Sequence, residues 1–220
     1  MEEKNKTKEI LEWVYCILIA IVIVLIIKSF IGVPTVVKQE SMYPTLKQNE
    51  RLWLNRVGAT FNKMPKRGDV ITFEAPNTTK GTSSLDINHI DFSNPVAPYE
   101  YKPENIFAKF TYNILEIGKV SYIKRVIGLP GEHVQIKDGG VYINGEKLQE
   151  DYLQDYVVTE AMGGLYVDIT VPENCVYVMG DNRPESKDSR CFGCIPVERI
   201  ESKAAFRFWP LNKFGKLVAK

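Results

Sequence analysis

The feature that most constrains this chain is a long apolar run near its N-terminus. Every residue from 14 to 27 is apolar or aromatic, and about 20 such residues in a helix, at about 1.5 Å per residue, span the roughly 30 Å hydrocarbon core of a bilayer. Lys28 can extend its amine toward lipid headgroups, and Trp13 and Tyr15 are of the kind enriched at membrane interfaces. The run predicts one transmembrane helix over residues 13–33, after a short segment of residues 1–12.

A cleaved secretory signal is the competing interpretation of the same run. Such a signal has a shorter apolar core and a small-x-small cleavage site behind it, whereas this run continues into residues 30–34, FIGVP, which offer no such site. An uncleaved anchor is therefore favoured. Three lysines within residues 4–8 face three basic residues within residues 38–51, so the positive-inside count does not fix the orientation.

Residues 34–220 are long enough for one globular domain with a buried core. The chain carries 28 Lys and Arg against 27 Asp and Glu, so no net charge draws it to nucleic acid, and nucleic-acid binding is disfavoured. Cys191 and Cys194 have the spacing of half a zinc site, but no second pair and no nearby histidine completes the four ligands. We expect no metal and no cofactor, and either a local disulfide or two plain thiols at these positions.

The pattern of the domain predicts a mainly β fold. Short β-branched and aromatic segments between turn signals predict strands at residues 51–57, 69–73, 121–127, 133–137, 141–143, 165–171, 175–179 and 204–208. Asn144-Gly145 predicts a hairpin turn. Between the strands, residues 75–119 form an insertion, whose residues 77–99 are rich in polar residues and predict an exposed loop. Asn77 begins a triplet that fits a glycosylation sequon, but such triplets are common by chance. Apolar spacing from Pro103 to Gly118 predicts a short amphipathic helix.

Ser41 is the candidate nucleophile, because it lies in a turn-like stretch shortly after the apolar run. A serine hydroxyl needs a base, and neither His89 in the insertion nor His133 on a predicted strand has a convincing context. Lys124 is the alternative, because strand alternation places it on one face with apolar neighbours, which lowers the pKa of a lysine. Each residue alone is better explained as a turn serine or a surface lysine, so the prediction rests on their occurring together.

Four motifs, in order, resemble those of the bacterial type I signal peptidases, which are membrane-anchored serine proteases with a Ser-Lys dyad. They are SMYPTL at residues 41–46, RGDV at 67–70, KRVIGLPGE at 124–132 and GDNRPESKDSR at 180–190. Residues 204–212, AAFRFWPLN, are similar to the closing strand of the family. The resemblance implies a signal-peptidase or LexA-like β fold of short antiparallel strands behind an N-terminal transmembrane helix.

The resemblance also implies a role for each site residue. Ser41 attacks the scissile carbonyl and offers its backbone N–H to the oxyanion, while Lys124 transfers the proton. Ser186 is similar to the serine that orients the lysine amine. Asp188 and Arg190 resemble the pair that holds this loop, for which a solvated ion pair of little energetic weight is the alternative. Asp181 and Asn182, the second and third residues of the same motif, are implied to support this loop.

Two positions depart from the family pattern. Many relatives have serine or glycine two residues before the nucleophile, where this chain has Gln39, and glycine or aspartate immediately before it, where this chain has Glu40. The hydroxyl donor to the oxyanion is therefore missing, and the Gln39 amide is the candidate replacement. Cys191 and Cys194 flank the Phe-Gly that follows the last motif, and a disulfide between them would tighten that loop.

The implied substrates are pre-proteins that carry a signal peptide with small side chains at the first and third positions before the cut. Such substrates need shallow apolar pockets beside an exposed strand edge, for which Met42, Val36 and Ile123 are the candidates. The family orientation places the N-terminus in the cytoplasm and the domain on the outer face, with the bilayer as a partner. Two alternatives are a self-cleaving LexA-like repressor, which needs a DNA-binding region instead of a membrane helix, and an anchored β module without catalysis.

Overall fold

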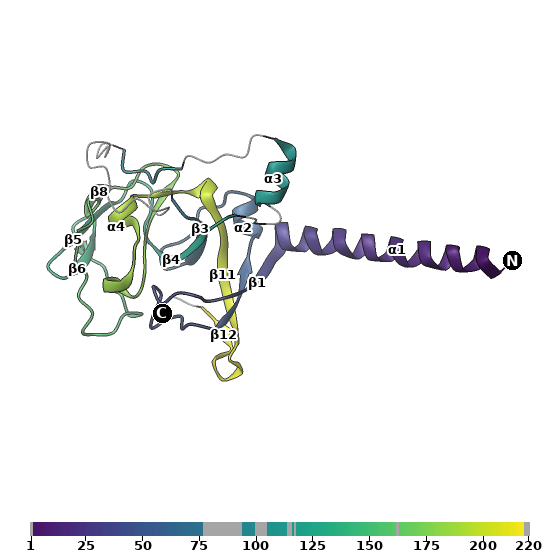
Figure 1. Cartoon of the computed structure of the whole chain (residues 1–220). Helices are drawn as coiled ribbons and strands as arrows, with labels where there is room; N and C mark the ends of the chain where they lie inside the picture. The colour runs from purple at the N-terminus through teal and green to yellow at the C-terminus, as the bar shows by residue number, and fades with distance from the viewer. Residues whose placement is uncertain are drawn as a thin grey trace.

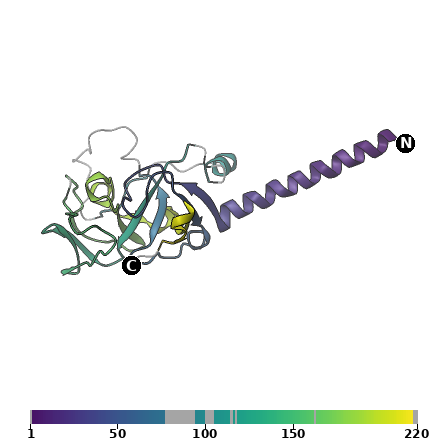
Figure 2. The ribbon, with the colours of Figure 1, turned by 90° about the horizontal axis from the view of Figure 1, so that it is seen from below.

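The protein consists of one long helix that projects from a mainly β domain (Figures 1 and 2). This computed structural model describes residues 2–76, 94–99, 105–113, 116, 118–161 and 163–217. In both views the helix extends away from the domain as a single rod, and α2 and α3 lie beside its base. The strands β5, β6 and β8 lie at the opposite end of the domain (Figure 1).

The N-terminal helix has the length and the composition of a membrane span. It comprises α1 (Glu2–Ile26) and a π-helical turn, η1 (Ile27–Ile31). Within its segment Lys8–Ile31, an 18-residue window has a mean hydropathy of 3.0, and none of that window is buried against the domain. The helix starts well before the predicted residue 13 and ends at Ile31 instead of residue 33. It ends early because Gly32 begins β1 (Gly32–Val36), which pairs with β2.

An eight-stranded antiparallel sheet forms the main layer of the domain. Its order is β1-β2-β11-β3-β4-β9-β10, and β12 pairs with β11. Beyond β1, its strands are β2 (Arg51–Asn55), β3 (Val70–Glu74), β4 (Ser121–Gly128), β9 (Cys175–Met179), β10 (Ile195–Pro196), β11 (Ile200–Trp209) and β12 (Gly215–Lys216). This order brings β4 between β3 and β9, which are far apart in the sequence.

A second, four-stranded sheet has the order β7-β6-β5-β8. Its strands are β5 (His133–Lys137), β6 (Gly140–Ile143), β7 (Glu146–Lys147) and β8 (Asp168–Thr170). Asn144 and Gly145 connect β6 and β7 with φ angles of 52° and 86°, the left-handed pair that a tight hairpin turn of type I′ requires. The predicted hairpin is therefore confirmed.

Short helical segments connect the strands. They are α2 (Val57–Thr60), α3 (Ile106–Asn113), η4 (Arg183–Glu185), α4 (Ser189–Phe192), η5 (Val197–Arg199) and η6 (Leu211–Lys213). The helix predicted from Pro103 to Gly118 corresponds to α3, while Pro103 and two residues of the apolar spacing, Ile114 and Ile117, lie outside the described residues.

Part of the predicted loop at residues 77–99 belongs to the core instead of the surface. Ala97 is 4% exposed, its backbone N–H donates to the Cys194 carbonyl, and the Cys194 N–H donates to the Pro95 carbonyl. These bonds satisfy backbone groups that burial would otherwise leave unpaired, so this piece of chain packs beside the main sheet. Asn77 and His89 lie outside the described residues.

Candidate active site

Ser41 lies in a tight turn between β1 and β2. Within the turn, the Tyr43 N–H donates to the Glu40 carbonyl at 2.9 Å, and the Leu46 N–H donates to the Met42 carbonyl at 2.8 Å. The side chains of Met42 and Leu46 are fully buried in an apolar cluster with residues of β2 and β3. These two anchors fix the turn, so Ser41, at 7% exposure, has a defined position over the sheet.

Lys124 on β4 reaches this serine. Its Nζ donates a hydrogen bond of 2.6 Å to Ser41 Oγ, and its side chain is 2% exposed. Nζ also lies 5.5 Å from the centre of the ring of Tyr122, two residues earlier on β4 and therefore on the face that strand alternation predicts for the neighbours of the amine. The structure thus brings together the two residues that the sequence singled out as nucleophile and base.

The surroundings of Lys124 disfavour the protonated form of its amine. Burial lowers the pKa of the amine from 10.5 to about 8, because an ammonium loses its hydration in an apolar enclosure. The nearby carboxylates of Asp188 and Asp181 oppose this effect, and the Arg190 guanidinium adds to it. A lysine with this pKa has a substantial neutral fraction near neutral pH.

Asp188 and Arg190 form a buried pair, which excludes the alternative of a solvated surface ion pair. Both side chains are 0% exposed, and the guanidinium donates to the two carboxylate oxygens, each over 2.9 Å. Asp188 also accepts from the Gly180 N–H at 3.0 Å, and Arg190 donates to the Arg183 carbonyl at 2.7 Å. The pair therefore fixes the whole loop between β9 and α4.

Asp181 pairs with Arg125, a residue that the sequence reasoning did not assign to the site. Arg125 donates to both carboxylate oxygens at 2.8 and 2.7 Å, and both side chains are buried. It also donates to the Gly68 carbonyl at 2.9 Å and to Thr45 Oγ1 at 3.3 Å. Arg125 therefore links the RGDV motif, the Ser41 turn and the loop after β9, and its place next to Lys124 was the available signal.

Arg183 is a second buried cation that the sequence reasoning left out. It is 0% exposed and donates to Glu150, to Thr159 Oγ1 at 2.6 Å and to the Gly180 carbonyl at 3.0 Å. These bonds connect the segment around residues 150–159 to the loop after β9. No sequence spacing relates Arg183 to Glu150, so only the fold reveals this contact.

Gly180 packs directly against both Ser41 and Ser186. A Cβ atom added at Gly180 would overlap the Ser41 carbonyl oxygen and the Ser186 hydroxyl, so both groups lie against the bare Cα of this glycine. Ser186 is 7% exposed, and its hydroxyl has no hydrogen-bond partner among the described residues. Such a buried hydroxyl is available to a neighbouring amine, although no bond to Lys124 is present.

Asn182 holds the backbone at the serine. Its N–H donates to the Ser41 carbonyl at 3.0 Å, and its side-chain amide donates to the Glu40 carbonyl at 3.2 Å. The Glu40 carbonyl belongs to the same peptide group as the Ser41 N–H, so Asn182 orients that N–H. Gln39, the candidate second donor, has an exposed side chain.

The three candidate substrate contacts have different environments. Met42 is 0% exposed and lies under the serine turn, so its side chain supports the site from below instead of facing a substrate. Val36 is exposed at the end of β1, and Ile123 on β4 is half-buried. Only Val36 and Ile123 are therefore accessible to a bound peptide in this conformation.

The histidine and cysteine residues lie outside this arrangement. His133, on β5 of the small sheet, contacts the exposed Asp168 carboxylate. All four cysteines are free thiols, so the structure contains no bond between Cys191 and Cys194. Among the described residues, no group of three or more His, Cys, Asp or Glu side chains is arranged to hold a metal ion.

Comparisons with known proteins find similarity along most of the chain. A family model described as signal peptidase, peptidase S26, matches residues 10–209. Signal peptidase IB of Staphylococcus aureus (strain COL) is 34% identical over 220 residues, covering 94% of this chain and 93% of that protein. Signal peptidase I T of Bacillus subtilis (strain 168) is 34% identical over 216 residues, covering 96% and 91%. A crystal structure of a signal peptidase I from Enterococcus faecalis V583 matches with 28% identity and a TM-score of 0.41, covering 65% of this chain and 98% of that one.

Proposed function

This chain belongs to the S26 family of signal peptidases, serine peptidases that remove signal peptides from secreted pre-proteins, and we propose that it does so with Ser41 as nucleophile and Lys124 as general base. One observation carries the assignment. The Lys124 amine contacts Ser41 Oγ over 2.6 Å in a site that is almost fully shielded from water. A buried lysine in contact with a serine is poorly explained by stability, because burial of the amine disfavours its charge.

The lowered pKa supplies the base. At pH 7 a pKa of about 8 leaves roughly a tenth of the Lys124 amines neutral, compared with about 0.03% at the ordinary value of 10.5. The neutral amine takes the proton from Ser41 as Oγ forms a bond to the scissile carbonyl carbon, and it then gives that proton to the leaving amine. Water hydrolyses the acyl-enzyme in a second step that uses the same amine as base.

The Ser41 N–H is the proposed donor to the oxyanion. It makes no hydrogen bond among the described residues, and Asn182 fixes the peptide group to which it belongs. A fixed donor that requires no rearrangement stabilises the charge that develops on the carbonyl oxygen. The exposed Gln39 amide stays a candidate for the second donor, and Ser186 for orienting the neutral amine of Lys124.

The sheet topology supports an extended peptide as the substrate. β4 pairs with β9 only from Arg125 onward, whereas its partner on the other side, β3, pairs with it from Ser121. The edge of β4 that precedes Lys124 is therefore not paired with β9, and an incoming strand can add its backbone hydrogen bonds there. Val36 and Ile123 are the proposed contacts for small side chains of the substrate.

We propose further that α1 and η1 anchor the domain to the outer face of the membrane, with the N-terminus in the cytoplasm. β1 follows the helix without a linker and leads to the Ser41 turn, so the nucleophile stays near the bilayer. A pre-protein held in the same bilayer by its own apolar segment then meets the enzyme at a raised effective concentration.

The test uses the full chain in detergent with a pre-protein whose signal peptide ends in Ala-x-Ala. We expect a trimmed product from the wild-type protein and none from Ser41→Ala or Lys124→Ala, while Thr170→Ala and Lys137→Ala, which change exposed residues of β8 and β5, keep their activity. Circular dichroism checks that every variant is folded. Cleavage by Ser41→Ala or Lys124→Ala near the wild-type rate would refute the dyad, and cleavage of the chain itself would favour a self-cleaving function.

A further inference from the structure

Glu50 is a buried carboxylate that the proposed catalytic chemistry does not use. It directly precedes β2, and its side chain is 4% exposed. One terminal nitrogen of Arg207, on β11, donates to both carboxylate oxygens over 2.7 Å each. The Lys213 amine donates to one of these oxygens at 3.2 Å, and the Lys47 backbone N–H donates to the other at 3.1 Å. Burial of a carboxylate is unfavourable unless such donors satisfy it, so these contacts give Glu50 a fixed position.

The same donors keep Glu50 ionised. Burial alone would raise the pKa of its carboxyl group, because an anion loses hydration there. The Lys47 N–H, the Lys213 amine and the Arg207 guanidinium outweigh burial and hold this pKa below its ordinary value. The Arg207 bonds therefore join two charged groups, and such bonds are shorter and stronger than those between neutral groups.

Glu50 also closes the stretch of chain that carries Ser41. The Val37 N–H donates to the Glu50 carbonyl at 2.9 Å, and the Asn49 N–H donates to the Val37 carbonyl at 2.9 Å. Residues 37–50, the Ser41 segment, therefore leave the end of β1 and return to the start of β2 at neighbouring points. Any group that fixes Glu50 fixes the base of this segment.

The middle of the Ser41 segment is held between two arginines. The Thr45 carbonyl accepts from the second terminal nitrogen of Arg207, and Thr45 Oγ1 accepts from Arg125, each at 3.3 Å. Arg125 follows Lys124 on β4. Arg207 therefore holds the segment at its base through Glu50 and near its middle through Thr45, so the position of Ser41 relative to β4 depends on this arginine.

We propose that Arg207 is a positioning residue, which holds Ser41 Oγ within reach of the Lys124 amine by fixing Glu50 and Thr45. The inference rests on the proposed Ser-Lys chemistry, in which proton transfer requires the 2.6 Å contact between the serine and the lysine. Within the described residues, the side-chain hydrogen bonds of Arg207 go to Glu50 and Thr45, so it acts through the Ser41 segment and not on the substrate. Misplacement of a reacting group by about 1 Å lowers a rate on the order of 100-fold.

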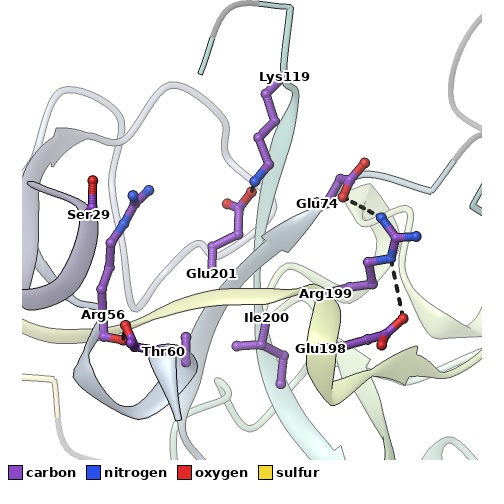
Figure 3. A pocket seen from close by; sticks show the side chains of 10 residues that line it. Ser29, Arg56, Thr60, Glu74, Lys119, Glu198, Arg199, Ile200 and Glu201 are labelled. Carbon is purple, nitrogen blue, oxygen red and sulfur yellow. Dashed lines mark hydrogen bonds and ion pairs between the residues drawn. The ribbon is translucent and has the colours of Figure 1, made fainter. Parts of the chain in front are cut away.

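Arg199, which directly precedes β11, provides a matched comparison. It pairs with Glu74 of β3 over 2.8 Å, and the two side chains are 12% and 11% exposed. Figure 3 shows its guanidinium between the carboxylates of Glu74 and Glu198. Within the described part of the chain, its hydrogen bond and ion pairs include no residue of the Ser41 segment. Loss of Arg199 therefore removes an arginine–carboxylate pair that is buried to a similar degree as that of Arg207, without releasing Ser41.

The experiment measures steady-state cleavage of a pre-protein by the full chain and its variants in detergent. Arg207→Gln should lower kcat about ten-fold or more and leave KM within about two-fold, because the bound substrate meets a displaced serine. Arg207→Lys should recover part of kcat, since an amine keeps the charge beside Glu50 but lacks the planar fork that also reaches Thr45. Arg199→Gln should keep the wild-type kcat although it loses a comparable ion pair.

A binding measurement separates positioning of the serine from shaping of the substrate site. In a Ser41→Ala background no Oγ remains to be positioned, so the addition of Arg207→Gln should leave the Kd of a fluorescently labelled pre-protein unchanged within about two-fold. Glu50→Gln should lower kcat as Arg207→Gln does. The double variant should lose no more than either single variant, because the two residues act as one unit.

Thermal unfolding shows whether each variant is folded at the assay temperature, and Arg207→Lys, which keeps the charge, carries the same comparisons if Arg207→Gln is unfolded. A wild-type kcat for Arg207→Gln, an equal fall of kcat in Arg199→Gln, or a weakened Kd in the Ser41→Ala background would overturn the proposal. Cleavage by Ser41→Ala would count against the dyad whatever Arg207 does. An inactive Ser41→Ala protein beside a fully active Arg207→Gln protein would count against the positioning role alone.

Discussion

The backbone N–H of Asn182 donates a hydrogen bond of 3.0 Å to the Ser41 carbonyl, so the loop after β9 holds the turn after β1 from across the sheet. The Lys124 amine contacts the same serine from β4, the strand that lies next to β9. Three segments that are far apart in the sequence therefore meet at one serine. The geometry of the site depends on the sheet order more than on any local motif.

The pKa of Lys124 predicts the pH dependence of cleavage. In the proposed mechanism the neutral amine is the active form, so kcat/KM should rise about ten-fold per pH unit below pH 8 and level off above it, with an apparent pKa of about 8. Steady-state cleavage of a pre-protein from pH 6 to 10 measures this profile. A profile that is flat from pH 6 to 8 would show that Lys124 does not act as the base.

The burial of Lys124 also predicts that this residue lowers the free energy of unfolding while the proposed activity depends on it. Below pH 8 the amine is charged in both the folded and the unfolded states, and the folded state carries the full penalty of burying it. Lys124→Met should therefore be inactive but raise the free energy of unfolding by on the order of 1–3 kcal/mol at pH 7.

The lowered pKa of Lys124 also makes the stability of the wild-type protein depend on pH. Between pH 8 and 10.5 the unfolded state binds more protons than the folded state, so the wild-type protein gains stability as the pH rises. The advantage of Lys124→Met should fade over that window. Urea unfolding at pH 7 and pH 10 measures it, with Lys66→Met, which changes an exposed lysine, as the control. A less stable Lys124→Met protein at pH 7 would contradict the prediction.

The sequence predicted eight of the twelve strands among the described residues, and the position of the lysine, because both depend on local alternation. β5 and β9 have the predicted bounds, and Lys124 lies beside Tyr122 as period-two alternation requires. β1 escaped prediction because its first residues continue the apolar run, and only their pairing with β2 separates strand from helix. Local patterns do not contain such pairings.

The buried ion pairs could not be predicted from local sequence patterns either. Asp188 and Arg190 were as consistent with a solvated pair as with a buried one, and their 0% exposure follows from the packing of α4 and β9 around them. Arg183 is satisfied by Glu150 and Thr159, which no spacing relates to it. The motifs named Ser41 and Lys124, which the structure brings into contact, whereas the network of ion pairs and hydrogen bonds around them required the tertiary structure.

Asn182 should act on turnover and leave substrate binding largely intact. Asn182→Ala removes the side-chain bond to the Glu40 carbonyl, so the Ser41 N–H loses part of its orientation toward the oxyanion. We expect kcat to fall roughly ten-fold or more with a smaller change in KM. Affinity for a peptide aldehyde, which forms a tetrahedral adduct, should fall in proportion to kcat/KM. Gln149→Ala, which removes an exposed amide whose one hydrogen bond among the described residues is to Asp151, is the control. An unchanged kcat for Asn182→Ala would exclude the positioning role.

Gly180 should tolerate no side chain, because its Cα lies against both the Ser41 turn and Ser186. In Gly180→Ala the new methyl group would overlap the Ser41 carbonyl oxygen and the Ser186 hydroxyl, so the Ser41 turn and the Ser186 side chain must move. Such overpacking costs about 1–3 kcal/mol, and a displacement of the nucleophile by about 1 Å lowers the rate on the order of 100-fold. Cleavage assays and thermal unfolding measure the two effects separately. Gly58→Ala is the matched control, since an added Cβ there meets no atom within 4 Å, and wild-type activity of Gly180→Ala would show that the turn is not held in the way this contact implies.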